Sequence, residues 1–352
     1  MVHPYRSLPP RALWHDGVAG ADRHRFADLW RPRHALTRDT RIATFGSCFA
    51  RHVARALREA GCTVLDAEPR PPMMPPAVAE ARGYGVFAAR TGNVYTARQM
   101  RELLEDAATG RVDPRLVWRR GARFVDALRP RIEPLGMGSE AEVLALRAWH
   151  LERLARTLRQ AETLVLTLGL TEFWEDAEAG RALPLCPGVA GGTFDPSRHL
   201  WRQARSAEVL EELRTIRRLL ERFRPGMRML LTVSPVPLAA TASGDHVLLA
   251  TTRAKAVLRA AVAEFVEDTP EADYFPALEL ATHPACATGR WWEPDWRGVT
   301  AEGVGRIMGV FLAAQGLGPA LPPRPLPAEA ADPEAAEDAS CDEILLASVA
   351  RR

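Results

Sequence analysis

The fold of this chain is decided by residues 41–50, which read Arg41-Ile42-Ala43-Thr44-Phe45-Gly46-Ser47-Cys48-Phe49-Ala50. The first five predict a short, buried strand, and the apolar spacing that follows predicts a helix over 47–60. A strand that turns through a glycine into a helix lifts the next side chain, Ser47, beside the free N–H groups of the helix start. Several hydrolase folds place a nucleophile there, whereas these residues alone favour a helix N-cap.

Strands and helices alternate along the rest of the chain. We expect further strands at 62–65, 163–168, 227–233 and near 274–275, and helices at 96–108, 139–160, 207–223, 248–268 and 301–315. This alternation indicates a parallel sheet covered on both faces, with a ligand site along the carboxyl ends of the strands. Those ends carry Gly46-Ser47, Gly169-Leu170-Thr171-Glu172 and Ser234-Pro235-Val236-Pro237.

Composition divides the chain into three parts. Residues 1–40 are polar and aromatic and predict an arm packed on the domain, and residues 41–316 hold the α/β pattern. Within them, 66–92 is expected to be a long loop rich in proline, and 175–205 an irregular stretch. Residues 317–352 turn to Pro, Ala, Asp and Glu, which predicts a mostly disordered tail.

Bulk composition narrows the class of protein. A chain of 352 residues with 47% hydrophobic content fits one large α/β domain with insertions or two smaller ones. The net charge of +2 gives no broad basic field, so nucleic acid is not the expected partner. The five cysteines are scattered and lack a C-x-x-C pair, so we expect neither a metal site nor a disulfide framework, and no cofactor. Without a signal peptide or a membrane span, a cytoplasmic location is expected.

Nine blocks of the sequence, in order, resemble a named family. Between about residues 4 and 315 the chain is similar to GSCFA-domain proteins, a bacterial group related to the SGNH (GDSL-like) hydrolases. The blocks begin at Pro4, Ile42, Gly92, Thr167, Cys186, Thr232, His246, Tyr274 and Arg297.

The resemblance implies a three-layer α/β/α sandwich with a mostly parallel sheet, long loop insertions and Ser47 as nucleophile. In SGNH enzymes the serine N–H, a glycine N–H and an asparagine side chain form the oxyanion hole. The resemblance places Gly92 and Asn93 in the second block of that pattern. The third block, normally Gly-x-Asn-Asp, is replaced by Gly169-Leu170-Thr171-Glu172, so Gly169 and Thr171 would help the oxyanion.

Two departures from the family pattern bear on chemistry. Thr171 stands where the asparagine is expected, and losing one oxyanion donor costs about 10²–10³ in rate. Asn93 would then supply the amide. The second departure is the missing Asp-x-x-His, because the corresponding residues are Asp295-Trp296-Arg297-Gly298.

A serine nucleophile needs a base, so two other histidines are candidates. His246 is favoured because it belongs to a block that resembles the family, and His283 is the second choice. Glu172 and Asp295 are the candidate orienting acids. The alternative for His246 is an N-cap or surface-loop residue of the helix at 248–268.

Three further residues are candidate substrate contacts, namely Trp174, Lys255 and Arg297. Core packing or a solvated helix face explains such residues equally well. The sequence therefore predicts a serine-dependent esterase or O-acyltransferase that acts on a small-molecule or carbohydrate ester. The alternative is a non-catalytic glycan- or acyl-binding protein on a degenerate SGNH scaffold. The oligomeric state is not predicted.

Overall fold

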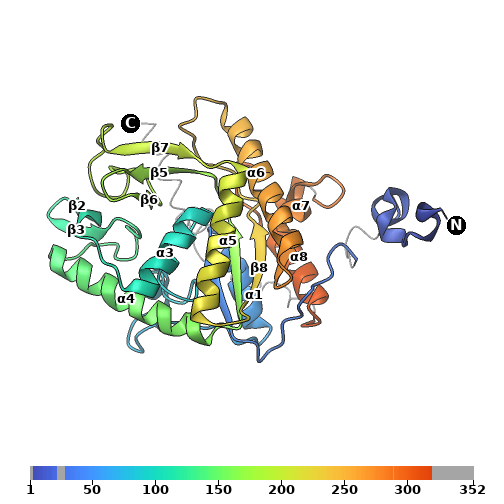
Figure 1. The fold of residues 1–352 in the computed structure, drawn as a ribbon, viewed down its shortest axis with the longest axis horizontal. Coiled ribbons are helices and arrows are strands. Elements are labelled where there is room, and N and C mark those ends of the chain that lie inside the picture. The colour runs from blue at the N-terminus through green and yellow to red at the C-terminus, as the bar shows by residue number, and fades with distance from the viewer. Residues whose placement is uncertain (1–2, 22–27, 288, 319–352) are drawn as a thin grey trace.

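A four-stranded parallel sheet forms the centre of the computed structural model, which describes residues 3–21, 28–287 and 289–318 (Figure 1). Its strands lie in the order β1-β4-β8-β9, and all three neighbouring pairs are parallel. They are β1 (Ile42–Gly46), β4 (Thr163–Leu168), β8 (Arg228–Val233) and β9 (Ala272–Phe275). Residue Val64 forms a single parallel bridge to Ile42, where a full strand at 62–65 was expected.

Helices cover both faces of this sheet, which confirms the expected three-layer α/β/α sandwich. One face packs against α3 (Ala97–Thr109), α4 (Glu140–Gln160), α5 (Ser206–Phe223) and α6 (Val247–Asp268). The opposite face packs against α1 (Ala50–Glu59), α7 (Ala277–Thr282) and α8 (Ala301–Ala314). The six-residue helix α2 (Pro76–Ala81) lies in the long loop that was expected at 66–92.

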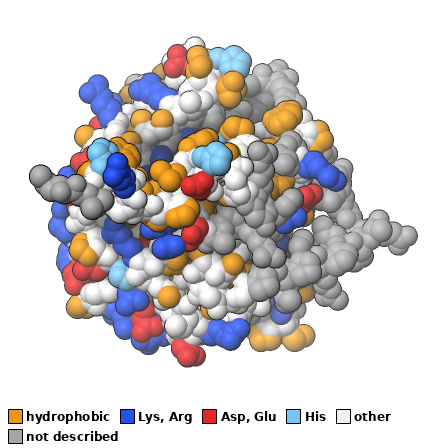
Figure 2. All heavy atoms as spheres, turned by 90° about the vertical axis from the view of Figure 1, so that its right-hand side faces the viewer, with side chains coloured by type: hydrophobic (Ala, Val, Ile, Leu, Met, Phe, Trp, Pro, Cys, Tyr) orange, Lys and Arg blue, Asp and Glu red, His pale blue; other side chains and the backbone are white. Residues whose placement is uncertain are grey.

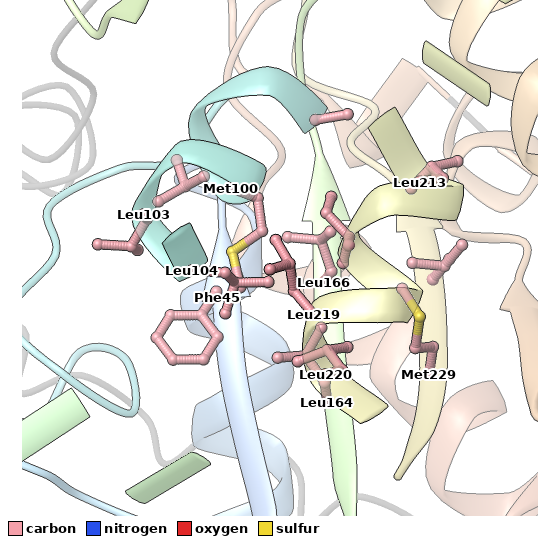
Figure 3. Packing of buried hydrophobic residues seen from close by; sticks show 14 of the residues in the cluster. Phe45, Met100, Leu103, Leu104, Leu164, Leu166, Leu213, Leu219, Leu220 and Met229 are labelled. Atoms are coloured by element: carbon pink, nitrogen blue, oxygen red, sulfur yellow. The ribbon is translucent and has the colours of Figure 1, made fainter. Parts of the chain in front are cut away.

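Alternation along the strands divides the apolar core between the two faces. Phe45 of β1 and Leu164 and Leu166 of β4 point into the larger core, whereas Val165 points into the other. Figure 3 shows the larger core, where Phe45 lies below Met100 of α3 and the β4 leucines meet helix α5. This period of two fixes the register of the strands. Because the strands are parallel, their polar carboxyl ends all lie at the same rim of the sheet.

Two small antiparallel sheets lie outside the sandwich. One is the hairpin of β2 (Val117–Arg120) and β3 (Arg123–Asp126), and the other has the order β6-β5-β7. Its strands are β5 (Glu172–Asp176), β6 (Arg181–Leu183) and β7 (His199–Gln203). The prediction of an irregular stretch at 175–205 is therefore wrong for these strands. Strand β5 begins directly at the rim, because Glu172 is its first residue.

The segment before β1 has two different parts. Residues 3–21 form short helical turns at Pro4–Ser7, Pro10–Ala12 and His15–Ala19, none with a buried side chain. Trp30, in contrast, is buried in the second core, where its ring lies 5.1 Å from Phe275 and 5.8 Å from Phe311. Buried packing on the domain is thus seen at Trp30, whereas Trp14 of the earlier part is exposed and makes a ring contact with His283 at 5.8 Å. Residues 319–352, most of the expected tail, lie outside the described residues.

The surface has no dominant charge on the face that Figure 2 shows, where basic, acidic and apolar side chains are interspersed. This matches the small net charge of +2. Within the described ranges, no helix is both long and apolar enough to cross a bilayer.

Candidate functional site

Ser47 occupies a tight turn between β1 and α1. Gly46 has φ +143°, and a Cβ there would lie 2.4 Å from the Thr167 carbonyl oxygen, so the turn requires glycine. The Ser47 N–H donates to the same oxygen at 3.0 Å. The Ser47 Oγ atom is buried and has no hydrogen-bond partner within the described residues. The N-cap residue of α1 is Phe49, so the Ser47 hydroxyl does not cap the helix.

A second segment, Gly92–Thr96, lies beside this turn. The Val94 N–H donates to the Gly46 carbonyl at 2.9 Å, which fixes Asn93 and Tyr95 next to the end of β1. Gly92 has φ +67°, a left-handed conformation that favours glycine. Thr96 and Gln99 then form a capping box that starts α3. The structure thus brings Gly92 and Asn93 to the same rim as Ser47.

The third segment, which follows β4, packs directly on the serine. A Cβ built at Gly169 would lie 2.9 Å from the Ser47 Cβ and 3.3 Å from its Oγ. The N–H groups of Gly169 and Leu170 both donate to the Tyr95 carbonyl, at 2.9 and 3.0 Å. In this conformation the Gly169 N–H, expected as an oxyanion donor, therefore donates to a backbone carbonyl, as does the Ser47 N–H.

Thr171 is buried at the same rim, and its carbonyl accepts the Ala204 N–H at 2.8 Å. Its Oγ1 accepts a hydrogen bond from the Gln203 side-chain amide of β7. The hydroxyl proton of Thr171 therefore remains to be donated. Two further donors of the rim, Gly92 and Asn93, come from the second segment.

Lys255 reaches this rim from α6. Its Nζ donates to the Gly169 carbonyl at 2.8 Å, and the residue is buried. Gly169 thus lies between Ser47 and Lys255. Beside the amine is a small apolar cluster of Tyr95, Leu170, Leu238 and Ala254.

His246 is the N-cap residue of α6, and its Nδ1 accepts the Leu248 N–H at 3.2 Å. Its ring is exposed. Nine residues of helix separate it from Lys255, which is about 13 Å at 1.5 Å per residue. The structure therefore gives His246 the capping contact that was its alternative, at the outer end of the rim.

Glu172 anchors the loop that leads to His246. Its Oε2 accepts from the Thr241 hydroxyl at 2.7 Å, and Thr241 also lies within hydrogen-bond distance of Ser243. Burial raises the pKa of Glu172, although the hydrogen bonds from Thr241 and the Ala242 backbone act in the opposite direction. Glu172 and the His246 loop are thus brought together.

The remaining candidates lie elsewhere. His283 follows α7 after β9, three strands from β1, which is about 14 Å across a sheet. Its Nδ1 accepts the Ala285 N–H at 3.1 Å. Asp295 Oδ1 accepts the N–H groups of Arg297 and Gly298, at 2.8 and 3.1 Å, so this carboxylate forms a turn. Neither residue makes a hydrogen bond to Ser47 within the described residues.

Trp174 lines a hollow beside the rim. Other lining residues are Tyr95, Leu170, Glu172, Cys186 and Trp201. The Trp201 indole N–H is buried without a partner in the described residues. Reasoning from sequence missed Tyr95 and Trp201. The block at 92–97 held a signal for Tyr95, whereas Trp201 lies in a strand that was not predicted.

Cys48 and His52, next to Ser47 in sequence, also belong to this end of α1. Burial, together with the charges of Arg51 and Arg55, lowers the pKa of His52 to about 3, so its imidazole is neutral. In the described part of the chain, no disulfide joins Cys48, Cys62, Cys186 or Cys286. Cys341 lies outside the described residues.

A comparison with models of known protein families gives a match over most of the chain. The model of the GSCFA family matches residues 41–311, which include all three rim segments, α6 and the candidate histidines. A search of curated proteins found no match.

Proposed function

The chain belongs to the GSCFA family, and from that premise we propose that it is a serine-dependent esterase or O-acyltransferase with an acyl-enzyme on Ser47. One observation carries the proposal. The Ser47 hydroxyl is buried and unpartnered within the described residues, in a turn that requires glycine on its strand side and packs Gly169 against it. A structural serine at such a position normally bonds its hydroxyl to a neighbour.

In the proposed reaction, Ser47 Oγ attacks the carbonyl carbon of an ester. The new O–C bond forms as the C=O π pair moves to the carbonyl oxygen, and the hydroxyl proton passes to a base. The oxyanion then collapses, the bond to the leaving oxygen breaks, and the base returns the proton to it. Water or a second hydroxyl attacks the acyl-enzyme in the same way, which gives hydrolysis or transfer.

The oxyanion needs donors aimed at the position where its charge develops. Because the Ser47 and Gly169 N–H groups donate to backbone carbonyls, we assign this role to Gly92, Asn93 and Thr171. Thr171 fits because its hydroxyl proton remains to be donated after Gln203 has bonded its oxygen. In this assignment the oxyanion donors come from two segments of the rim, the one that holds Gly92 and Asn93 and the one that follows β4.

His246 is the proposed base, with Glu172 as its orienting acid. Support comes from the contact of Thr241 with Glu172, which ties the His246 loop to the rim. To reach Ser47 the imidazole must exchange its capping contact with Leu248, a change that substrate binding has to drive. Catalytic hydrogen bonds often form only in the substrate complex.

The proposed substrate is a small-molecule or carbohydrate ester. Trp174, Trp201 and Glu172 line a hollow that Tyr95 also lines, and the Tyr95 carbonyl accepts the Gly169 N–H. Aromatic faces with a few polar groups suit a sugar ring or a short acyl chain. We assign Trp174 to this contact. Cytoplasmic location stays a prediction.

Turnover of an acetyl ester by the purified chain tests the proposal. Ser47→Ala is expected to abolish it, and His246→Ala to lower kcat by about 10²–10⁴ if the imidazole is the base. Arg156→Met, at an exposed ion pair far along α4, is the matched control. Full activity of Ser47→Ala would remove the serine from the mechanism.

A second candidate, a non-catalytic glycan- or acyl-binding protein, is favoured by one observation. No histidine contacts the Ser47 hydroxyl within the described residues. Such a protein would bind acetylated sugars equally well before and after the substitution Ser47→Ala, and it would turn over no ester. Calorimetry beside the ester assay separates the two.

A further inference from the structure

Lys255 is the only lysine of the chain, and it is buried. The residue is 6% exposed, although lysine is almost never buried unless its amine is paired. The chain otherwise uses arginine for its basic side chains. A buried amine in this place therefore calls for a specific partner.

The partner is the backbone of the candidate site. The Lys255 Nζ donates to the Gly169 carbonyl at 2.8 Å, a hydrogen bond that gains strength when the donor is an ammonium. The same glycine packs on Ser47, because a Cβ at Gly169 would lie 3.3 Å from the serine Oγ. One residue thus separates the amine from the proposed nucleophile.

The surroundings favour a strong electrostatic effect. Tyr95, Leu170, Leu238 and Ala254 form an apolar cluster beside Lys255, and Tyr95 also holds Gly169 through its carbonyl. Charges interact over longer distances in an apolar setting than in water. Gly169 is therefore held from two sides, by Tyr95 at its N–H and by Lys255 at its C=O.

We propose that Lys255 is a positioning residue of the Ser47 site, whose amine holds the Gly169 backbone against the serine and places positive charge beside the developing oxyanion. The proposal rests on the acyl-transfer function. In this proposal Lys255 does not contact the substrate directly, whereas the sequence suggested it as a candidate substrate contact.

A purely structural role makes a different prediction. If Lys255 served to tie α6 to the end of β4, its removal would lower stability and leave the chemistry of folded molecules intact. The proposed role instead means that removing the amine lowers the reactivity of Ser47 in folded molecules. The rate at which a serine-reactive phosphonate labels Ser47 separates these two outcomes.

Lys255→Met keeps the length of the side chain and removes the charge, whereas Lys255→Arg keeps the charge. We expect labelling of Ser47 to slow at least about tenfold in Lys255→Met, below the 10²–10³ of a direct donor, and to recover in part in Lys255→Arg. In ester turnover the loss should fall on kcat rather than KM. Arg259→Met is the control, because Arg259 lies one turn further along α6 and binds Glu279. A wild-type labelling rate in Lys255→Met overturns the role.

A measurement without activity covers the case in which Lys255→Met fails to fold. Because the chain has one lysine, ¹³C,¹⁵N-lysine labelling gives a single side-chain signal in the wild-type protein. Ser47→Ala and phosphonylation of Ser47 are both expected to shift that signal, and an unchanged signal in both overturns the positioning role.

If wild-type Ser47 is not labelled at all, the acyl-transfer function fails. A signal that still shifts in Ser47→Ala then keeps Lys255 in the site of a binding protein.

Discussion

At the scale of single residues, the account depends on how closely Gly169 packs on Ser47. The two follow strands that are neighbours in the sheet: Gly46 is the last residue of β1, and Gly169 comes directly after the last residue of β4. Gly46 shapes the turn through its φ of +143°, whereas Gly169 provides space for the serine side chain. Gly46 therefore shapes the backbone and Gly169 makes room for the serine, so only Gly169 can be substituted without straining the backbone.

Gly169→Ala is expected to abolish labelling of Ser47 while the protein stays folded. The added methyl would lie 2.9 Å from the Ser47 Cβ, closer than side chains approach, so the serine must move. Phosphonate labelling rates and thermal unfolding measure the two effects. Gly309→Ala in α8, where a Cβ meets nothing within 4 Å, is the control with unchanged labelling. Wild-type labelling in Gly169→Ala would show that the contact is unimportant.

At the scale of elements, buried ion pairs connect the small sheet to the sandwich. Arg181 of β6 binds Asp106 of α3 at 2.5 Å and lies 3.5 Å from Glu102. All three side chains are almost fully buried. The pairs hold the sheet that begins with Glu172, so they position one side of the rim.

Arg181→Met is expected to lower the free energy of unfolding by about 3–5 kcal/mol, because it removes one of the two arginine partners of the buried Asp106 carboxylate and the buried cation beside Glu102. Urea unfolding measures it. Arg156→Met, which breaks an exposed pair with Glu152, should cost less than about 1 kcal/mol. An Arg181→Met protein as stable as that control would contradict the account.

The elements also show what the sequence could and could not predict. The run at 163–168 is apolar and unbroken, and β4 has those bounds. Strand β5 reads Glu172-Phe173-Trp174-Glu175-Asp176, and its charged residues pair with arginines distant in sequence, such as Arg98 and Arg198. Such pairing leaves no local periodicity, so the small sheet was not predictable.

The same limit applies to the candidate site. The three rim segments follow from glycines and polar residues at strand ends, which the sequence displays. The hydrogen bond of the Gly169 N–H to the Tyr95 carbonyl joins residues distant in sequence, and nothing local encodes it. The contact of His246 with Leu248 is local, and the sequence offered it as the alternative for that histidine. The sequence offered Lys255 as a candidate substrate contact, but its hydrogen bond to Gly169 joins residues 86 positions apart.

At the scale of the whole molecule, stability should depend on pH through a buried pair, Glu68 and His150. The His150 Nδ1 bonds the Glu68 carboxylate, and both side chains are fully buried. Burial and the charge of Arg129 lower the pKa of His150 to about 4. For Glu68, burial acts to raise the pKa, but the bond from His150 and the charge of Arg129 outweigh it and lower the pKa to about 2.

Both shifts predict loss of stability in acid. Unfolded His150 takes up a proton below about pH 6.5 and folded His150 only below about 4, so stability falls as pH drops through this window. Between pH 7 and pH 5, His150 is expected to lower the free energy of unfolding by about 2 kcal/mol. Glu68 adds a second loss of stability, because its pKa is lowered in the folded protein; this loss develops as pH falls from about 4.5 toward 2.

Urea unfolding at pH 7 and 5 measures the dependence, with His150→Gln as the variant that should flatten it. His34→Gln is the control, because that histidine is only partly buried and bonds the Pro270 carbonyl. A slope in His150→Gln equal to that of the wild type would contradict the assignment of a neutral, buried His150.

The central claim is that Ser47 is the reactive group of this fold, and activity-based labelling tests it most directly. The full-length chain is treated with a serine-reactive phosphonate, and the modified residue is mapped by mass spectrometry. The account predicts a single adduct on Ser47, absent in both Ser47→Ala and Gly169→Ala. An unmodified Ser47 in the folded wild-type protein, or an adduct on another residue, would contradict it.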